Sequence, residues 1–258
     1  NTVIVYDFGF VGDRPYLVQE LLGGEDLIEI IHRRDPLSQK ERLRCLTEIA
    51  RALAFAHSEG VIHRDVKPSN IRILEDGRIK VLDFGIARLL DASTKLTLVG
   101  TTMGTAGYLA PEQIRGTNIN HLADIYGIGA ILHFMITGEA PYRGASREII
   151  MNKQMKELPP ALASYTLQDP ACEILQPVVY KAMAIEREQR YGSTAELWRE
   201  FSICARQTAQ LSQQTPSTAA DDSLYQFVFR GELLAGGDPP PRKHQLQKDF
   251  KFSDQQLK

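Results

Sequence analysis

The stretch that decides the fold runs from Val61 to Asn70 and reads V-I-H-R-D-V-K-P-S-N, and Asp83-Phe84-Gly85 follows it. An apolar pair runs into ionisable residues, a proline and an asparagine, a mixture poorly suited to a buried strand or to an amphipathic helix. Polar chemistry of this kind is typical of a loop that rigid neighbours hold in place. We therefore expect the functional residues of the chain to lie here.

A long helix is predicted directly before this loop. Ser38 to Glu41 has the spacing of a capping box, and apolar residues follow it at the three-and-four rhythm of one helix face. This pattern predicts a helix from about Gln39 to His57. Gly60 ends the helix, so the chain enters the loop directly.

A β-hairpin is predicted directly after the loop. Ile71 to Leu74 and Arg78 to Leu82 are short apolar runs that flank an Asp-Gly turn, which is a strong hairpin signal. Asn70 and Asp83 lie at the two ends of this hairpin. The sequence therefore predicts that these two polar residues come close together.

The first residues of the chain predict β structure. Thr2 to Phe8 and Tyr16 to Leu22 are rich in β-branched and aromatic residues, and a glycine-containing stretch separates them, so they are interpreted as a strand pair. Gly23 and Gly24 then break the second strand. A short helical segment is expected near Asp26 to Arg33.

The second half of the chain is predicted to be mostly helical. Residues 86–107 lack periodicity and are long for a plain connection, which favours a functional or mobile loop. Leu122 to Thr137 is almost wholly apolar and indicates a buried central helix, in which the carboxylate of Asp124 requires a partner. Further helices are expected at about 146–157, 171–185 and 194–206. The composition then becomes polar, and 207–258 is interpreted as a largely disordered tail with one short structured piece at Leu224 to Leu234.

Composition narrows the class of protein. The 258 residues are 43% apolar and 24% charged, as is usual for a soluble globular protein. A formal net charge of −2 gives no general attraction to nucleic acid or to an anionic membrane. No apolar run approaches the roughly 18 to 20 residues of a membrane-spanning helix. Cys45, Cys172 and Cys204 are widely spaced, so we expect inert thiols in the reducing cytoplasm rather than zinc ligands or disulfides.

The predicted loop and hairpin bring together two carboxylates, one cation and one amide. These are Asp65, Lys67, Asn70 and Asp83. Carboxylate and amide oxygens suit Mg²⁺, which usually keeps several waters and binds through one or two carboxylates plus phosphate oxygens. A nearby lysine would neutralise phosphate charge, and the second carboxylate could accept a proton from a hydroxyl nucleophile.

Three ordered motifs carry a family resemblance. H-R-D-V-K-P-S-N, then D-F-G, then A-P-E at Ala110 to Glu112 resemble the catalytic loop, the metal loop and the activation-segment end of a protein kinase. The resemblance covers roughly residues 1–206. It implies an α+β, protein-kinase-like fold, with 1–22 as remnant strands and hinge of the N-terminal lobe and 23–206 as a mainly helical C-terminal lobe with a short β-hairpin.

The resemblance implies a role for each polar residue of the loop. Asp65 is similar to the catalytic base and Lys67 to the lysine that steadies the transferred phosphoryl group, while Asn70 and Asp83 are similar to the Mg²⁺ ligands. The lysine two residues after Asp65, together with Gly104-Thr105, resembles the serine/threonine class. The whole pattern most resembles the eukaryotic-like kinases of bacteria, which implies ATP and Mg²⁺ as cofactors and protein serine or threonine hydroxyls as acceptors.

The nucleotide contacts follow from the same resemblance. Tyr16 to Leu22 resembles the connector between lobes, with Gln19 at the gatekeeper position, the backbone of Glu20 and Leu22 facing adenine, and Glu25 reaching the ribose. The sequence departs from the family pattern at Arg72, where kinases usually place an apolar residue under the adenine ring. We expect the methylene stem of Arg72 to lie there and its charge to reach solvent, so that isoleucine at this position would tighten ATP binding.

The resemblance also implies regulatory and structural residues. Arg64 is similar to the arginine that in many kinases pairs with a phosphorylated activation loop. Glu112 and Arg190 match a buried salt bridge beneath the activation segment, and Asp124 matches the helix carboxylate that supports the catalytic loop. The candidate phosphorylation sites, including by autophosphorylation, are Thr97, Thr101 and Thr102.

No glycine-rich loop and no V-A-I-K-like strand occur in the sequence, so the residues that hold the α- and β-phosphates are expected upstream of Asn1. The main hypothesis is a Mg²⁺-dependent serine/threonine protein kinase. The alternatives are a shortened, inactive kinase-like interaction module and a small-molecule phosphotransferase of kinase-like fold.

Overall fold

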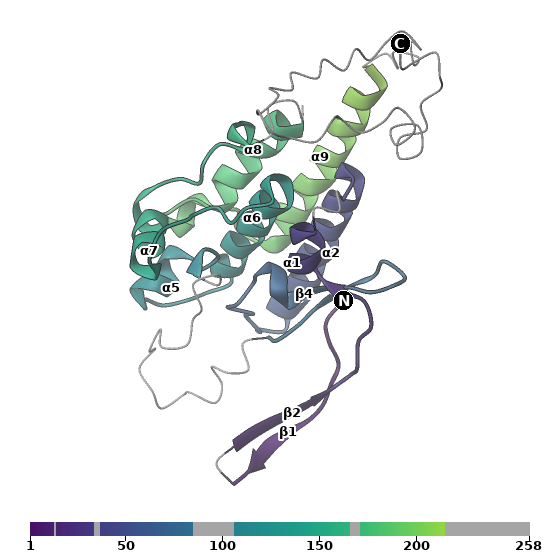
Figure 1. The fold of residues 1–258 in the computed structure, drawn as a ribbon, viewed down its shortest axis with the longest axis vertical. Coiled ribbons are helices and arrows are strands. Elements are labelled where there is room, and N and C mark those ends of the chain that lie inside the picture. Colours follow the sequence, from purple (N-terminus) through teal and green to yellow (C-terminus); the bar gives the residue numbers. More distant parts are fainter. Residues whose placement is uncertain (13, 34–36, 85–105, 166–170, 215–258) are drawn as a thin grey trace, which may run out of the picture. The chain divides into compact units, whose positions relative to one another are not determined.

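The computed structural model describes residues 1–12, 14–33, 37–84, 106–165 and 171–214. Within these ranges the fold is mixed and mainly helical, with few strands, as expected for an α+β protein (Figure 1). The strands are β1 (Val5–Val11), β2 (Arg14–Gln19), β3 (Glu25–Asp26), β4 (Ile71–Ile73) and β5 (Ile79–Val81). The helices are α1 (Leu27–His32), α2 (Gln39–Ser58), α5 (Pro111–Arg115), α6 (Leu122–Thr137), α7 (Arg147–Lys156), α8 (Ala171–Ala182) and α9 (Thr194–Gln214), with 3-10 turns η1 (Pro68–Asn70), η2 (Leu162–Ser164) and η3 (Arg187–Gln189).

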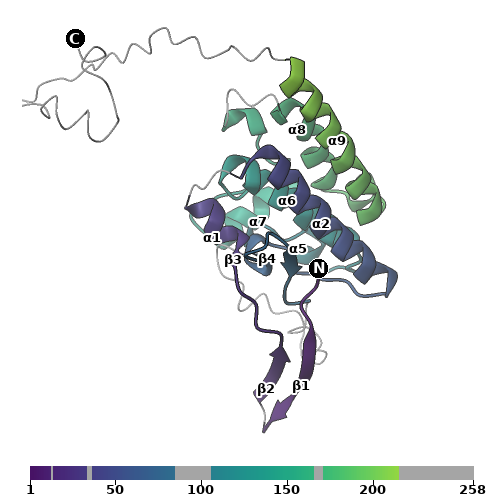
Figure 2. The same cartoon turned by 90° about the vertical axis from the view of Figure 1, so that its right-hand side faces the viewer.

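Helix α6 forms the centre of the helical core. Every residue from Ala123 to Ile136 is buried, as the apolar sequence predicts. Helices α2 and α8 pack against α6, and α9 packs against both of them, so the four helices lie side by side in both views (Figures 1 and 2). Burial of each large apolar side chain contributes about 1.5–3 kcal/mol, which makes this layer a rigid support for the loop between α2 and β4. None of the helices in the described ranges is long and apolar enough to cross a membrane.

The predicted helix before the loop is confirmed. Ser38 Oγ accepts a hydrogen bond from the Glu41 amide at 3.3 Å, and Glu41 Oε2 accepts one from the Ser38 amide at 2.8 Å, which completes the capping box. Helix α2 ends at Ser58, and Gly60 follows with a φ of 75°. A positive φ at glycine is a common way to end a helix.

The predicted hairpin is confirmed, and the structure adds a strand that the sequence did not predict. Strands β4 and β5 pair antiparallel with Ile71 opposite Val81, and β3 pairs with β4 on the other side. The helical segment therefore begins at Leu27, one residue later than expected. A Cβ at Gly24 would lie 2.0 Å from the carbonyl oxygen of Ile73, and Gly24 has a φ of 80°, so the approach of β3 to β4 requires glycine here.

The N-terminal strand pair exists, but its predicted bounds are wrong. Strand β1 continues through Gly9 to Val11, and β2 ends at Gln19 rather than Leu22. Gly9 pairs with Tyr16 inside the ladder, whereas Gly12 has the positive φ of 61° that suits a turn. Most side chains of β1 are exposed, including Phe8 and Phe10.

Helix α9 is longer than predicted. It runs to Gln214 rather than to about Arg206. Phe201, Cys204 and Thr208 are buried at helical spacing, so one face of the helix still packs on the core after the composition has become polar. The piece predicted at Leu224 to Leu234 lies outside the described residues.

A substitution at Gly127 tests how closely α6 must approach the loop. A Cβ at this position would lie 2.7 Å from Val66 Cβ and 2.8 Å from the Val66 carbonyl oxygen. We therefore expect Gly127→Ala to lower the free energy of unfolding by about 1–3 kcal/mol, as overpacking does, despite the better helix propensity of alanine. Urea denaturation measures this change.

The matched control is Gly107→Ala, whose added Cβ would find its nearest neighbours at 3.5 Å, an ordinary contact. We expect this variant to keep the parent's stability. Equal stability of Gly127→Ala and the parent would show that α6 and the loop do not need this close approach.

Candidate active site

One buried carboxylate of the helical core holds the loop from Val61 to Asn70 in place. Asp124 on α6 is fully buried, and its two oxygens accept hydrogen bonds from the amides of His63, at 2.9 Å, and Arg64, at 2.7 Å. The Nε2 atom of His57 lies 2.7 Å from Asp124 Oδ2. The predicted support of the loop by Asp124 is confirmed, and the partners that its burial requires are the two loop amides and His57 of α2.

The structure brings Asp65, Lys67 and Asn70 together. Lys67 Nζ lies 2.8 Å from Asp65 Oδ2, and Asn70 Nδ2 donates to the same oxygen at 3.0 Å and to the Asp65 carbonyl oxygen at 2.8 Å. The side chain of Asp65 is 37% exposed, whereas Asn70 as a residue is only 5% exposed. A buried amide therefore orients an accessible carboxylate.

Asp83 is placed beside this group by its neighbours in sequence. The amide of Leu82 donates to the Asn70 carbonyl oxygen at 2.9 Å, and His63 Nε2 lies 2.7 Å from the Leu82 carbonyl oxygen. The ring centroids of His63 and Phe84 are 4.6 Å apart. Asp83 itself has a φ of 50° and is exposed, and it directly follows Leu82, whose backbone is bonded to Asn70 at the other end of the hairpin.

The residues present fit a magnesium ion. Both N–H groups of the Asn70 amide are directed to Asp65, which leaves the amide oxygen available as a ligand atom. This oxygen and the Asp83 carboxylate are the donor types that suit an ion that completes its shell with water and phosphate oxygens. Among the residues that the structure describes, no group of three or more His, Cys, Asp or Glu side chains could hold a metal ion.

The residues expected to contact nucleotide have other partners in the structure. Glu20 Oε1 lies 2.6 Å from Lys80 Nζ and accepts the Ile4 amide at 2.8 Å, and the hydrogen bond from Lys80 lowers the pKa of Glu20. Glu25 pairs with Arg33 at 2.7 and 2.5 Å, which lowers the pKa of Glu25. A ribose contact by Glu25 would compete with Arg33. It stays a prediction, as do the backbone contacts of Glu20 and Leu22 with adenine.

The expectation that Arg72 sends its charge to solvent is wrong. Its guanidinium donates to the carbonyl oxygens of Gly23 at 3.0 Å and Gly24 at 2.9 Å, and to Asp26 Oδ1 at 2.9 Å. Strand β3 pairs with β4 directly, so acceptors that the sequence places far away lie within reach. Arg72 therefore fixes the segment after β2 to the hairpin that carries Asn70.

The predicted pair beneath the activation segment is confirmed. Arg190 Nη1 and Nη2 donate to the two oxygens of Glu112 at 2.7 and 2.8 Å, and both residues are buried. Arg190 Nε also donates to the Ala184 carbonyl oxygen at 2.9 Å. A bidentate pair of this kind fixes geometry as well as charge, and it anchors α5 to the turn before α9.

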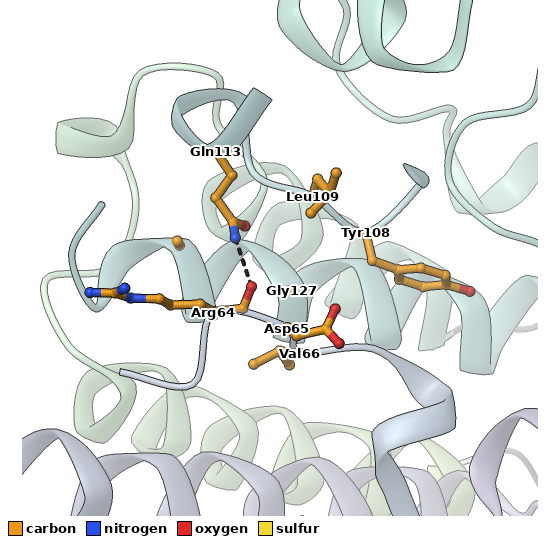
Figure 3. A pocket seen from close by; sticks show the side chains of 8 residues that line it. Arg64, Asp65, Val66, Tyr108, Leu109, Gln113 and Gly127 are labelled. Carbon is orange, nitrogen blue, oxygen red and sulfur yellow. Dashed lines mark hydrogen bonds between the residues drawn. The ribbon is translucent and has the colours of Figure 1, made fainter. Parts of the chain in front are cut away.

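A small cavity lies beside Asp65, lined by residues of the loop, of the segment before α5, and of α5 and α6 (Figure 3). Gln113 of α5 reaches into this region and donates to the carbonyl oxygen of Arg64. Sequence reasoning assigned no role to Gln113, because its burial and its contact with Arg64 are visible only in the structure. Other predicted residues lie outside the described residues: Gly85, Thr97, Thr101, Thr102, Gly104 and Thr105.

The chain is similar to known proteins over most of its length. The family described as "Protein kinase domain" matches residues 1–207. The chain belongs to the protein kinase family. Serine/threonine-protein kinase PknB of Mycobacterium tuberculosis is 38% identical over 202 residues, which cover 76% of this chain and 32% of the relative. The probable serine/threonine-protein kinase PknB of Lactococcus lactis is 39% identical over 202 residues, which cover 78% of this chain and 32% of the relative.

The fold is similar to a solved protein kinase structure. The crystal structure of Rad53 1-466 in complex with AMP-PNP matches with a TM-score of 0.63 and 22% sequence identity, over 77% of this chain and 49% of that chain. The relatives support a bacterial eukaryotic-like serine/threonine kinase as the branch of the family. The chain spans about a third of the length of these curated relatives.

Arg72→Ile tests the bracing role of the guanidinium. The substitution removes three charge-assisted hydrogen bonds, and we expect the free energy of unfolding to fall by about 1–2 kcal/mol. Urea denaturation measures the change. The control is Arg78→Ile, because Arg78 pairs with Asp76 while its side chain is 72% exposed, so its loss should cost less than about 0.5 kcal/mol. An Arg72→Ile variant at least as stable as the parent would contradict this role.

Proposed function

We propose that this chain supplies the catalytic loop of a serine/threonine protein kinase, which transfers the γ-phosphoryl group of ATP to a protein hydroxyl with Mg²⁺ as cofactor. The observation that carries the proposal is the arrangement of Asp65, Lys67 and Asn70. One accessible carboxylate is held by a cation at 2.8 Å and by a buried amide at 3.0 Å. This arrangement suits proton acceptance next to a phosphate.

Asp65 would act as the base. Lys67 and Asn70 both contact its Oδ2, which leaves Oδ1 to accept the proton of a substrate hydroxyl. A general base must lie within roughly 2.6–3.2 Å of the group that it deprotonates, and the exposure of the Asp65 side chain permits that approach. Positioned proton transfer of this kind contributes about 10² to 10⁴ in rate.

Lys67 and the metal ligands would stabilise the negative charge of the phosphate groups. Lys67 is the cation beside the base, and its position suits an electrostatic contact with the transferred group. Asn70 and Asp83 would hold Mg²⁺, which when bound neutralises charge on the phosphate oxygens. The fixed hydrogen bonds among Asp65, Lys67 and Asn70 mean that little reorganisation is needed when substrates bind.

Protein substrates are the acceptor class that this chain suits best. The buried Glu112–Arg190 pair anchors the segment that leads into α5, and such a fixed segment suits the docking of an extended peptide. The curated relatives are named serine/threonine-protein kinases. Autophosphorylation at Thr97, Thr101 or Thr102 belongs to the same proposal.

We also propose a cytoplasmic location. Cys45, Cys172 and Cys204 all lie in the described part of the chain, are buried and form no disulfide. Burial raises the pKa of the Cys45 thiol to about 12 and that of the Cys204 thiol to about 11. Protonated, buried thiols are inert, which fits a reducing compartment.

The exposed hairpin β1–β2 favours a second candidate function, that of an interaction module. Tyr6, Phe8, Phe10, Val11 and Val18 are all exposed, and apolar side chains gathered on one element usually need a cover. In a shortened, inactive homologue this hairpin would bind a partner. In the enzyme it would pack against further structure that completes the nucleotide site.

The two candidates differ in what precedes Asn1 in the reading frame. A continuous frame with a glycine-rich strand loop favours the enzyme, and the extended protein should transfer phosphoryl groups much faster than this chain alone. A start codon with a ribosome site at this point favours the interaction module.

Asp65→Asn tests the proposed base. The amide keeps the size of the side chain but cannot accept the hydroxyl proton, so we expect kcat for a protein substrate to fall by at least about 10², with little change in the thermal midpoint. The assay uses the full reading frame. Asp76→Asn makes the same chemical change on the exposed turn between β4 and β5 and should leave kcat unaltered. Undiminished transfer by Asp65→Asn would remove Asp65 from this role.

A further inference from the structure

Gln113 is a buried amide with a partner on each side. Its Nε2 donates to the carbonyl oxygen of Arg64 at 2.7 Å, and its Oε1 accepts the amide of Ala110 at 3.0 Å. The residue is only 5% exposed. The orientation of the amide follows from its partners, because a carbonyl oxygen can only accept and a backbone N–H can only donate.

The hydrogen bond from Gln113 restrains the backbone of Arg64, which has an unfavourable conformation. Its φ of 67° lies in the left-handed region, which costs free energy for any residue with a Cβ and persists only where the surroundings enforce it. Asp124 accepts the Arg64 amide at 2.7 Å, and Gln113 donates to the Arg64 carbonyl at 2.7 Å. The two soft dihedrals of Arg64 lie between these two peptide groups, so side chains from α6 and α5 together fix them.

The orientation of the base follows from this peptide. Figure 3 shows the side chains of Arg64 and Asp65 pointing in opposite directions from the carbonyl that Gln113 contacts. A rotation of the peptide between Arg64 and Asp65 would turn the Asp65 carboxylate relative to Lys67 and Asn70. The amide of Asp65 has a partner of its own, His63 Nδ1, but at a longer 3.2 Å.

We propose that Gln113 is a positioning residue that fixes the peptide between Arg64 and Asp65, and so aims the Asp65 carboxylate. Its consequence for phosphoryl transfer rests on the function proposed above. Through Gln113 the first turn of α5, which directly follows the segment 106–110, is connected to the base. The simpler possibility is that Gln113 only caps α5 through Ala110.

Gln113→Glu separates these two roles. The carboxyl group keeps an acceptor for the Ala110 amide, but once ionised it has no hydrogen to donate to the Arg64 carbonyl. Burial raises the pKa of a carboxyl group, and in its protonated form the O–H can donate to that carbonyl. The ratio of kcat in this variant to kcat in the parent should therefore fall roughly tenfold as pH rises from about 6 to about 8, and division by the parent removes the titration of groups that both proteins share.

Gln154→Glu is the matched control. Gln154 on α7 is fully buried and donates from Nε2 to the carbonyl oxygen of Leu109 at 2.8 Å, so the substitution disturbs the same kind of bond at Leu109 instead of at Arg64. Its kcat ratio to the parent should not depend on pH. Gln113→Met, which lacks any donor, should be slow across the whole pH range.

Hydrogen exchange of the segment 61–70, measured by mass spectrometry on the full chain, gives a readout that does not need activity. At pH 8 we expect exchange in Gln113→Glu and Gln113→Met to be several-fold faster than in the parent and in Gln154→Glu. A pH-independent kcat ratio for Gln113→Glu, or exchange equal to that of the parent, would overturn the proposal. Absence of transfer by the parent would count against the proposed function alone, since exchange still decides the role of Gln113.

Discussion

The carboxylate of Asp124 is the constraint on which the rest of the site depends. A fully buried carboxylate loses its hydration, at a cost of several kcal/mol. The hydrogen bonds of Asp124 with the amides of His63 and Arg64, and its contact with His57, offset this cost. Because these partners belong to the loop and to α2, the charge can be satisfied only when α2, α6 and the loop are correctly assembled. Folding of the helical core and ordering of the catalytic loop are therefore coupled.

The two residues whose amides bind Asp124 fix further parts of the site through their own contacts. His63, held by its amide, uses its ring to contact the carbonyl of Leu82 and to pack on Phe84, which places Asp83 between two fixed neighbours. Arg64, held by its amide, keeps a left-handed conformation that directs the chain into Asp65. Gly127 allows α6 to approach closely enough for these bonds to form.

Local patterns predicted the elements and the motif residues, but not the contacts between distant segments. The capping box at Ser38 and the Asp-Gly turn between β4 and β5 act within a few residues, and both predictions are confirmed. The partners of Arg72, and the Arg64 carbonyl that Gln113 contacts, lie more than 45 residues away in sequence, so no local pattern shows these contacts. The buried face of α9 near Thr208 likewise depends on packing, and the prediction from composition therefore placed the end of that helix too early.

Asp124 orders the loop before any substrate binds. Amide hydrogen exchange in Asp124→Asn, followed residue by residue by NMR, tests it most directly, because asparagine keeps the shape but offers one acceptor oxygen instead of two. We predict that the amide of His63 or of Arg64 loses about tenfold or more of its protection, the equivalent of one hydrogen bond of about 1.4 kcal/mol, while the amides of Ile128 and Ile131 in α6 keep theirs. Unchanged protection at both His63 and Arg64 would contradict it.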